Sequence, residues 1–153
     1  MRSVERAWAD VPAPPVADLA MMAWGWGEEA AAAFMGRAPM EVDRTSVGFE
    51  AATPLFELPP RASAAYLGTY VMSLLEGLVT QSRTGLFFDV VTRAHTLTML
   101  DQDVYWSDVV EAHLDGDQRE ALREVLTLLV ELRDMLNLDD EQVARFRVRS
   151  AGR

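Results

Sequence analysis

The residues of this chain best suited to chemistry are a carboxylate in an apolar segment and two histidines, His95 and His113. Glu76 lies among leucines, where loss of water contacts would raise the pKa of its carboxyl group. Arg93 and His95 follow in the next predicted helix and could pair with Glu76. Glu76, Arg93 and His95 therefore form the candidate pocket of a small enzyme or ligand-binding domain, with a structural ion pair as the alternative explanation.

Other catalytic and metal-binding patterns are missing from the sequence. The chain has no Cys and no Lys, which excludes thiol catalysis, cysteine metal sites, Schiff-base lysines and P-loop lysines. His95 has no carboxylate or second histidine three or four positions away, the spacing at which one helix face can hold a metal. Between His113 and Asp117, ligand-capable residues alternate, but helix caps and loop acids explain them better. We therefore predict no catalytic residue, no metal and no cofactor.

Acidic residues are concentrated in one part of the chain. The segment from Asp101 to Glu141 holds 13 acidic residues and 3 arginines, a balance of −10 that equals the net charge of the whole chain. The acids fall largely on the polar side of a helical pattern, which favours a face that attracts a basic partner. The candidate partner-binding residues on this face are Glu120, Glu124, Glu131 and Asp134.

This charge pattern leads to three hypotheses about function. The first is a non-enzymatic protein-binding module, of which a bacterial immunity or antitoxin protein that docks on a basic toxin is the most concrete form. The second is the pocket around Glu76. The third is a structural subunit of an oligomer, anchored by exposed tryptophans, namely Trp8, Trp24, Trp26 or Trp106. Acidity that serves only solubility is the simpler alternative to a docking face.

The composition also bears on partners and location. A net charge of −10 argues against binding nucleic acid, and the arginines after position 144 are expected to form a solvated terminus that balances nearby acids. The lack of Lys and Ile is typical of a GC-rich, here bacterial, genome. The charged first residues do not resemble a signal peptide. The longest apolar stretch, Ala64 to Val79, is interrupted by polar residues, so we expect a soluble, cytoplasmic protein that does not contact a membrane.

The elements that must position these residues are predicted to be helices, in one all-α domain over residues 1–153 with six to eight helices. At its centre we expect a helix from Arg61 to about Thr80. Its polar residues form one narrow stripe at helical spacing, which predicts burial on most sides. The members of that stripe are Thr69, Ser73, Glu76 and Thr80.

Around this centre, start and stop signals predict further helices. A proline-rich link follows the first of them, and either a short helix, which we favour, or a strand fits Arg37–Pro54. The loop Gln81–Gly85 is expected to follow the central helix, and Asp117 and Asp139 are expected to cap the last two helices. The predicted helices are 3–9, one from about 17, 28–35, 86–100, 104–114, 117–136 and 139–147.

The segment Pro54–Val71 resembles a family of uncharacterised bacterial domains. The similarity lies in Leu58-Pro59, followed by Tyr66-Leu67-Gly68-Thr69-Tyr70, where the family has a leucine-proline step and then tyrosine-leucine-proline-x-aromatic at a helix start. Gly68 stands at the position of the family's proline, and a looser similarity extends over Gln118–Leu132. The resemblance implies no activity and no site residues.

Overall fold

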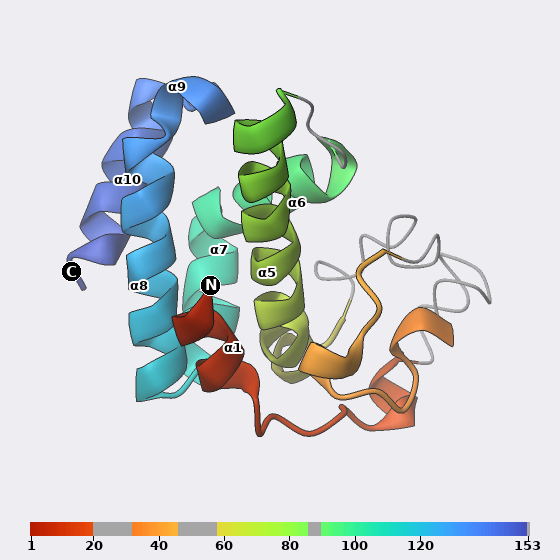
Figure 1. The fold of residues 1–153 in the computed structure, drawn as a ribbon. Coiled ribbons are helices and arrows are strands. Elements are labelled where there is room, and N and C mark those ends of the chain that lie inside the picture. Colours follow the sequence, from red (N-terminus) through yellow and green to blue (C-terminus); the bar gives the residue numbers. More distant parts are fainter. Residues whose placement is uncertain (20–31, 46–57, 86–89, 153) are drawn as a thin grey trace.

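The computed structural model describes residues 1–19, 32–45, 58–85 and 90–152. Within these ranges every regular element is a helix, which confirms the predicted all-α fold (Figure 1). Nine helical segments are described, three of them only three or four residues long. They outnumber the predicted six to eight because residues 101–111 and the end of the long acidic helix break into short pieces.

Helix α5 (Pro60–Thr84) runs through the centre of the fold, as predicted, but is longer than predicted. Pro60 occupies its first turn, where the missing N–H of proline costs no hydrogen bond. The predicted loop at 81–85 is wrong for all but its last residue. The helix continues until Gly85, which takes a left-handed conformation (φ 73°) and donates its N–H to the carbonyl of Gln81.

The length and composition of α5 would also suit a membrane span. An 18-residue window within it reaches a mean hydropathy of 1.2, whereas the sequence had suggested a stretch too short and too polar. Of that window 72% is buried inside the fold, which is the position of a core helix in a soluble protein.

The N-terminal helix α1 (Arg2–Trp8) lies against both α5 and the long acidic helix α8 (Gly116–Glu131) (Figure 1). Trp8 is fully buried, and its indole N–H donates to the carbonyl of Ala64 over 3.3 Å. A Cβ added at Gly68 would lie 2.5 Å from the Trp8 ring, so only glycine allows this approach. Trp8 is therefore a core residue and cannot be the oligomer anchor considered from the sequence.

The polar stripe of α5 is the surface on which residues 38–44 pack. The short helix η1 (Pro39–Glu41) lies in this segment, and the Thr69 hydroxyl donates to the Pro39 carbonyl over 2.8 Å. A single helical turn is thus what the structure contains in the described part of Arg37–Pro54, whereas residues 46–54 lie outside the described residues. Arg44 of the same segment pairs with the Glu76 carboxylate, while the Thr80 hydroxyl donates to the Glu76 carbonyl within α5. These contacts explain how polar groups of the stripe can lie on a largely buried helix.

The C-terminal half adds a layer of helices beside α5. It starts with α6 (Val90–Asp101), α7 (Asp103–Tyr105) and the π-helical segment η3 (Trp106–Glu111). It continues with α8, α9 (Arg133–Leu136) and α10 (Asp140–Ser150), which runs back antiparallel to α8 (Figure 1). The apolar stripe predicted on α8 is buried, with Leu126 and Leu129 fully inaccessible.

The caps of these helices agree in one case with the predictions and differ in the other. Asp139 accepts the backbone N–H of Gln142, as predicted, and the helix it caps continues to Ser150. The cap of α8 is Asp115 and not Asp117, because Gln118 completes a capping box with Asp115. Asp117 is thereby left exposed within the first turn of α8.

Candidate functional site

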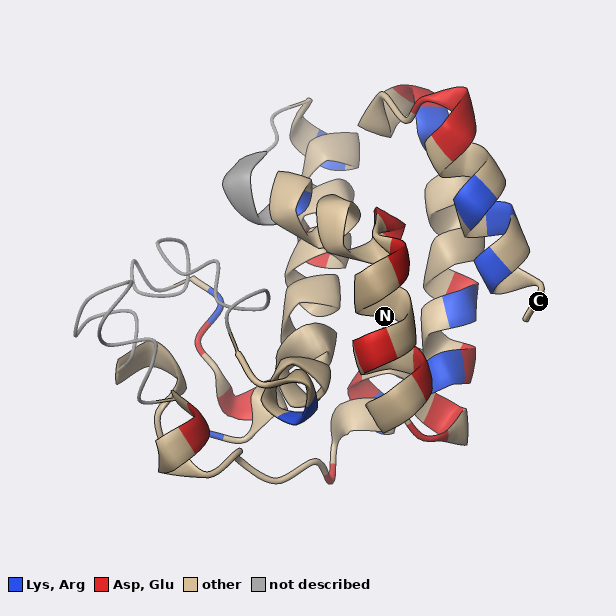
Figure 2. Ribbon diagram, turned by 180° about the vertical axis from the view of Figure 1, so that it is seen from behind, with Lys and Arg blue, Asp and Glu red and all other residues tan. Residues whose placement is uncertain are grey.

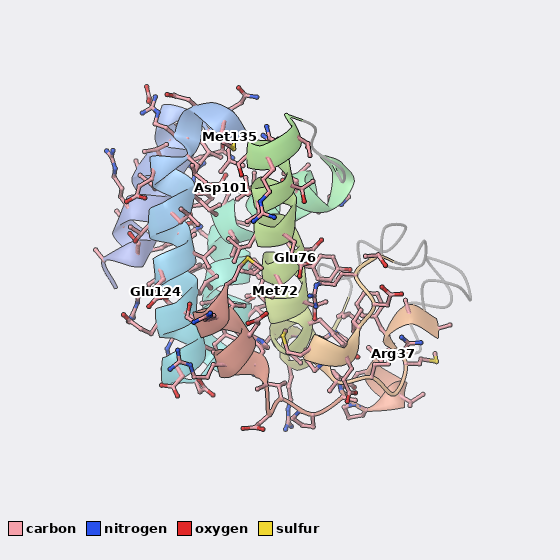
Figure 3. The ribbon with its side chains drawn as sticks, viewed as in Figure 1. Arg37, Met72, Glu76, Asp101, Glu124 and Met135 are labelled. Carbon is pink, nitrogen blue, oxygen red and sulfur yellow. The ribbon has the colours of Figure 1, made fainter. Side chains whose placement is uncertain are left out.

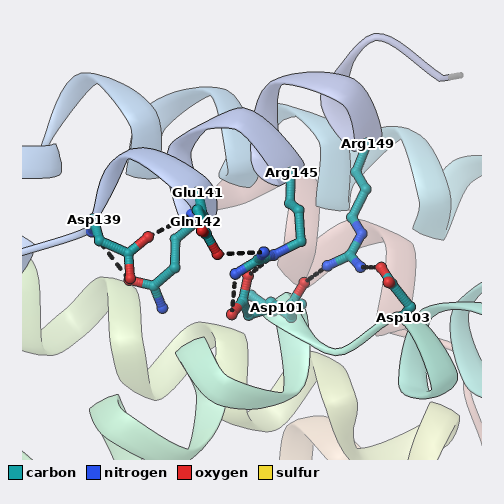
Figure 4. A network of polar contacts seen from close by, with 8 residues as sticks. Asp101, Asp103, Asp139, Glu141, Gln142, Arg145 and Arg149 are labelled. Carbon is teal, nitrogen blue, oxygen red and sulfur yellow. Dashed lines mark hydrogen bonds and ion pairs between the residues drawn. The ribbon is translucent and has the colours of Figure 1, made fainter.

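Much of the acidity of residues 101–141 is neutralised within the fold. The carboxylate of Asp101 accepts two hydrogen bonds from the Arg145 guanidinium, at 2.6 and 2.9 Å, and Asp103 pairs with Arg149 (Figure 4). These contacts join the end of α6 and the start of α7 to α10. The hydrogen bond with Asp101 raises the pKa of Arg145. Nine of the 13 acids in this segment have a side-chain contact within the described residues, which the sequence alone does not reveal.

Arg149 shows how firmly the C-terminal arginines are placed. Its side chain is only 6% exposed, its guanidinium lies 5.0 Å from the centre of the Trp106 ring, and it donates to the carbonyl of Leu100. Figure 2 shows the basic segments of α10 beside the acidic segments of the neighbouring helices. The expected solvated terminus is thus wrong for Arg145 and Arg149. Trp106 is half-buried under Arg149, while Trp24 and Trp26 lie outside the described residues.

Four acids of the segment remain available. Their carboxylates have no hydrogen-bond or ion-pair partner in the described part of the chain, and all four are exposed; they are Glu111, Asp117, Glu124 and Glu131. Three of them follow each other along one face of α8 at helical spacing, together with Glu120, which pairs with Arg123. We call Asp117, Glu120, Glu124 and Glu131 the acidic stripe. The predicted Asp134 lies beyond it on α9, where it pairs with Arg133.

An apolar groove of about 240 Å³ lies between α5 and α8, next to the acidic stripe. Its walls are Leu75, Leu78, Val79 and Ser82 from α5, Leu128 and Leu132 from α8, Met1, and Met135 from α9. Figure 3 shows Met135 at one end of this region and Glu124 on α8. Several of the wall residues are unusually accessible for their type: Met1 is 46% exposed, Val79 38% and Leu128 37%.

A second hollow, also about 240 Å³, extends the same surface between α1 and α8. Ser3, Arg6 and Ala7 of α1 face Asp117, Glu120 and Glu124 of α8 across it, with Ala121 between them. Three carboxylates and one guanidinium give this lining a negative balance. Helix α8 therefore presents its acidic stripe beside two hollows, one apolar and one acidic.

The three residues predicted to share a pocket have separate contacts. Glu76 pairs with Arg44 and not with Arg93 or His95, through hydrogen bonds of 2.6 and 3.0 Å to its two carboxylate oxygens. Hydrogen bonding to Glu76 raises the pKa of Arg44. Arg93 instead donates to the carbonyls of Leu136 and Met135 at the end of α9, where a cation stabilises the helix dipole.

His95 is half-buried, and its Nδ1 is buried with no hydrogen-bond partner in the part of the chain that the structure describes. An unpartnered buried nitrogen is unfavourable. His95 lines neither the apolar groove nor the second hollow. The geometry thus favours a structural ion pair for Glu76, which was the alternative weighed from the sequence.

The groove residues were not singled out from the sequence. Leu128, Val79 and Met135 belong to ordinary apolar helical patterns, and nothing in their spacing separates a groove wall from a core position. The sequence of α8 holds one weak indication of an exposed apolar position. Leu128 precedes the buried Leu129 and lies at helical spacing from Glu124 and Glu131, on the polar side of the helix. Arg44 could not have been paired with Glu76, because 32 residues separate them.

Comparison with known proteins gives no relative from which a function could be transferred. No protein-family model matches the chain, and no curated protein or solved structure is significantly similar to it.

Proposed function

We propose that this protein is a non-enzymatic protein-binding module that holds an amphipathic, basic helix of a partner protein. The observation that carries the proposal is the apolar groove between α5 and α8. Glu124 and Glu131, which no described residue neutralises, lie four residues before and three residues after its wall residue Leu128, so helical spacing places them beside it. A groove of this kind suits the apolar face of a helix, and acids at its edge suit lysines or arginines on the polar face.

The size and chemistry of the groove favour a helix over a small ligand. Its walls are leucine, valine and methionine, with Ser82 as the single polar side chain among the lining residues. Flexible methionines such as Met1 and Met135 adapt well to the side chains of a bound helix. The acidic stripe runs from Asp117 to Glu131, 14 residues or about 21 Å of helix, which is long enough to meet several turns of a partner.

The most specific form of the proposal is an immunity or antitoxin protein of a bacterium, acting in the cytoplasm on a basic toxin. The supporting features are the small helical fold, the unneutralised carboxylates, and the lack of a cluster of candidate metal ligands among the described residues. Charge attraction would speed the encounter, and the groove would then hold the complex.

The test is capture of the partner with four versions of the chain as bait. These are the natural chain, Glu124→Arg with Glu131→Arg, Val79→Asp, and the control Val148→Asp. Val148 is 53% exposed on α10, so its variant introduces the same charge on an exposed valine away from the groove. A partner held by the natural and control chains and lost by the other two supports the proposal. A partner held equally by all four would overturn it.

Association kinetics then separate the acidic stripe from general acidity. Glu124→Gln and Glu111→Gln each remove one exposed, unpartnered carboxylate, from the stripe and from η3 respectively. The Debye length falls from about 30 Å at 0.01 M salt to about 8 Å at 0.15 M, so association should slow over this range. Glu124→Gln should slow it further at low salt, whereas equal effects of the two variants would point to net charge alone.

A further inference from the structure

A third pocket, remote from the groove, combines opposite charges that no described residue neutralises. It has a volume of about 380 Å³ and lies where three parts of the chain meet. Val11–Pro15 and Asp18 form one side, and the first turns of α5 form another. His113, between η3 and α8, and Gln118, in the first turn of α8, close it. The pocket is within the size range of small-molecule sites.

The polar groups of this pocket are free to bind a ligand. The side chains of Arg61, Asp18 and His113 have no hydrogen-bond or ion-pair partner within the described ranges, although all three residues line the same cavity. The Gln118 side chain is only 6% exposed; its carbonyl oxygen accepts the N–H of Asp115, while its amide NH₂ has no described partner. Ion pairing satisfies arginines elsewhere in this fold, as in Arg44, Arg145 and Arg149. The Arg61 side chain is exposed and lines the cavity, so it is available to a ligand.

The start of α5 adds donors to the same wall. Its N-cap residue is Pro59, which makes no side-chain hydrogen bond to the helix. The backbone N–H groups of Arg61 and Ala62 belong to the first turn, which has no partners within a helix, and both residues line the pocket. A helix N-terminus with an adjacent arginine favours an anionic group.

The charges set the class of ligand. With His113 neutral, Arg61 and Asp18 cancel, so the lining as a whole suits a molecule without net charge. A doubly charged phosphate would be repelled by Asp18, whereas an ammonium group would be attracted to it. Prolines and alanines supply the remaining walls, which suit an apolar side chain.

We propose that this pocket binds a small zwitterion of the amino-acid class. Its carboxylate is held by Arg61 and the first N–H groups of α5, its ammonium by Asp18, and its apolar part by the proline-rich link. Ala62 of this pocket and Val79 of the groove are 17 residues apart on α5, or about 25 Å. The proposal therefore stands independently of the partner helix.

The test is titration of the purified chain with leucine, phenylalanine and proline, followed by calorimetry and by NMR. Leucinamide, which lacks the carboxylate, 4-methylpentanoate, which lacks the ammonium, and inorganic phosphate are the companion probes. We expect saturable binding of at least one amino acid and at least tenfold weaker binding of the companions. No saturable binding by any of the three amino acids would overturn the proposal, as would equal binding of the amino acid and its companions.

Variants tie the binding to this pocket. Arg61→Gln and Asp18→Asn should each weaken it at least tenfold, because each removes a charge-assisted contact. Arg83→Gln, which changes an exposed arginine at the other end of α5, should leave it unchanged. Circular dichroism and the melting temperature check that each variant is folded. Binding that survives both pocket variants in folded protein would contradict the proposed site.

Discussion

The two sides of α8 use the same acidic segment in opposite ways. On the side of α10, Asp101 and Asp103 are bound by Arg145 and Arg149, and the acids there hold helices together. On the side of α1 and α5, Glu124 and Glu131 have no partner among the described residues and border an apolar groove. Charge counted along a sequence is therefore the sum of a structural part and an available part, and only the second can attract a partner.

The largest difference between buried and groove-facing residues should come from two neighbouring leucines. Leu129 is fully buried, and Leu129→Ala should lower the free energy of unfolding by about 2–5 kcal/mol. Leu128 is 37% exposed in the groove wall, so Leu128→Ala should cost clearly less. Urea denaturation measures both. Equal losses would mean that the groove is part of the core and not a binding surface.

The next prediction concerns the packing of α1, which lines the hollow beside α8. Gly68→Ala would place a Cβ against the Trp8 ring and should cost about 1–3 kcal/mol through overpacking. Gly116→Ala, at the start of α8, meets no atom within 4 Å and is the matched control. It should be neutral or stabilising by about 0.4–1 kcal/mol. Trp8 fluorescence would report the displaced ring, and unchanged stability of Gly68→Ala would show that α1 is not fixed by this contact.

On the α10 side, two arginines that are two residues apart, and so on different sides of the helix, should differ in a similar way. Arg149→Ala removes hydrogen bonds to Leu100 and Asp103 and the contact with Trp106, and should cost about 1–3 kcal/mol. Arg147→Ala removes an exposed side chain and should change stability by less than about 0.5 kcal/mol. Thermal unfolding gives both values, and equal values would indicate that α10 is held by its apolar face alone.

The smallest expected change in stability distinguishes an acid that is paired with an arginine from one that has no described partner. Asp101→Asn weakens the paired contact with Arg145 and should give a small fall in the denaturant midpoint. Glu124→Gln has no described contact to lose and should leave the midpoint unchanged while it slows association with the partner. The comparison fails if Glu124→Gln destabilises the fold as much as Asp101→Asn does.

Local signals in the sequence were sufficient for most of the helices. The buried stripe of α8 and the Asp139–Gln142 cap were predicted because a 3.6-residue period and a capping box are short-range patterns. The same capping pattern, Asp115 followed by Gln118, was present at the start of α8, and choosing Asp117 overlooked it. The predicted end of α5 lies four residues too early: Ser82 and Thr84 stay within the helix, and their hydroxyls donate to the carbonyls of Val79 and Thr80.

The candidate site could not be predicted from such short-range patterns, because it is formed by segments that are far apart in the sequence. The groove is made by α5, α8 and Met1, and both the Glu76–Arg44 and Asp101–Arg145 pairs join residues more than 30 positions apart. Which acids stay available depends on which arginines fold back onto them. Glu120, Glu124 and Glu131 were placed correctly on the polar side of their helix; their role in binding a partner stays a prediction.

The docking of α1 has a consequence for the order in which the molecule is built. Seven residues are too few for a stable isolated helix, so α1 depends on the seating of Trp8 against α5, 56 positions later in the chain. Ala7 of α1 and Ala121 of α8 line the same hollow although more than a hundred residues separate them in the sequence, so the hollow forms only when a long stretch of chain has folded. During synthesis, the surface beside α8 is therefore completed only after α8 itself, Gly116–Glu131, has emerged. A partner that recognises this surface would not bind a shorter nascent chain.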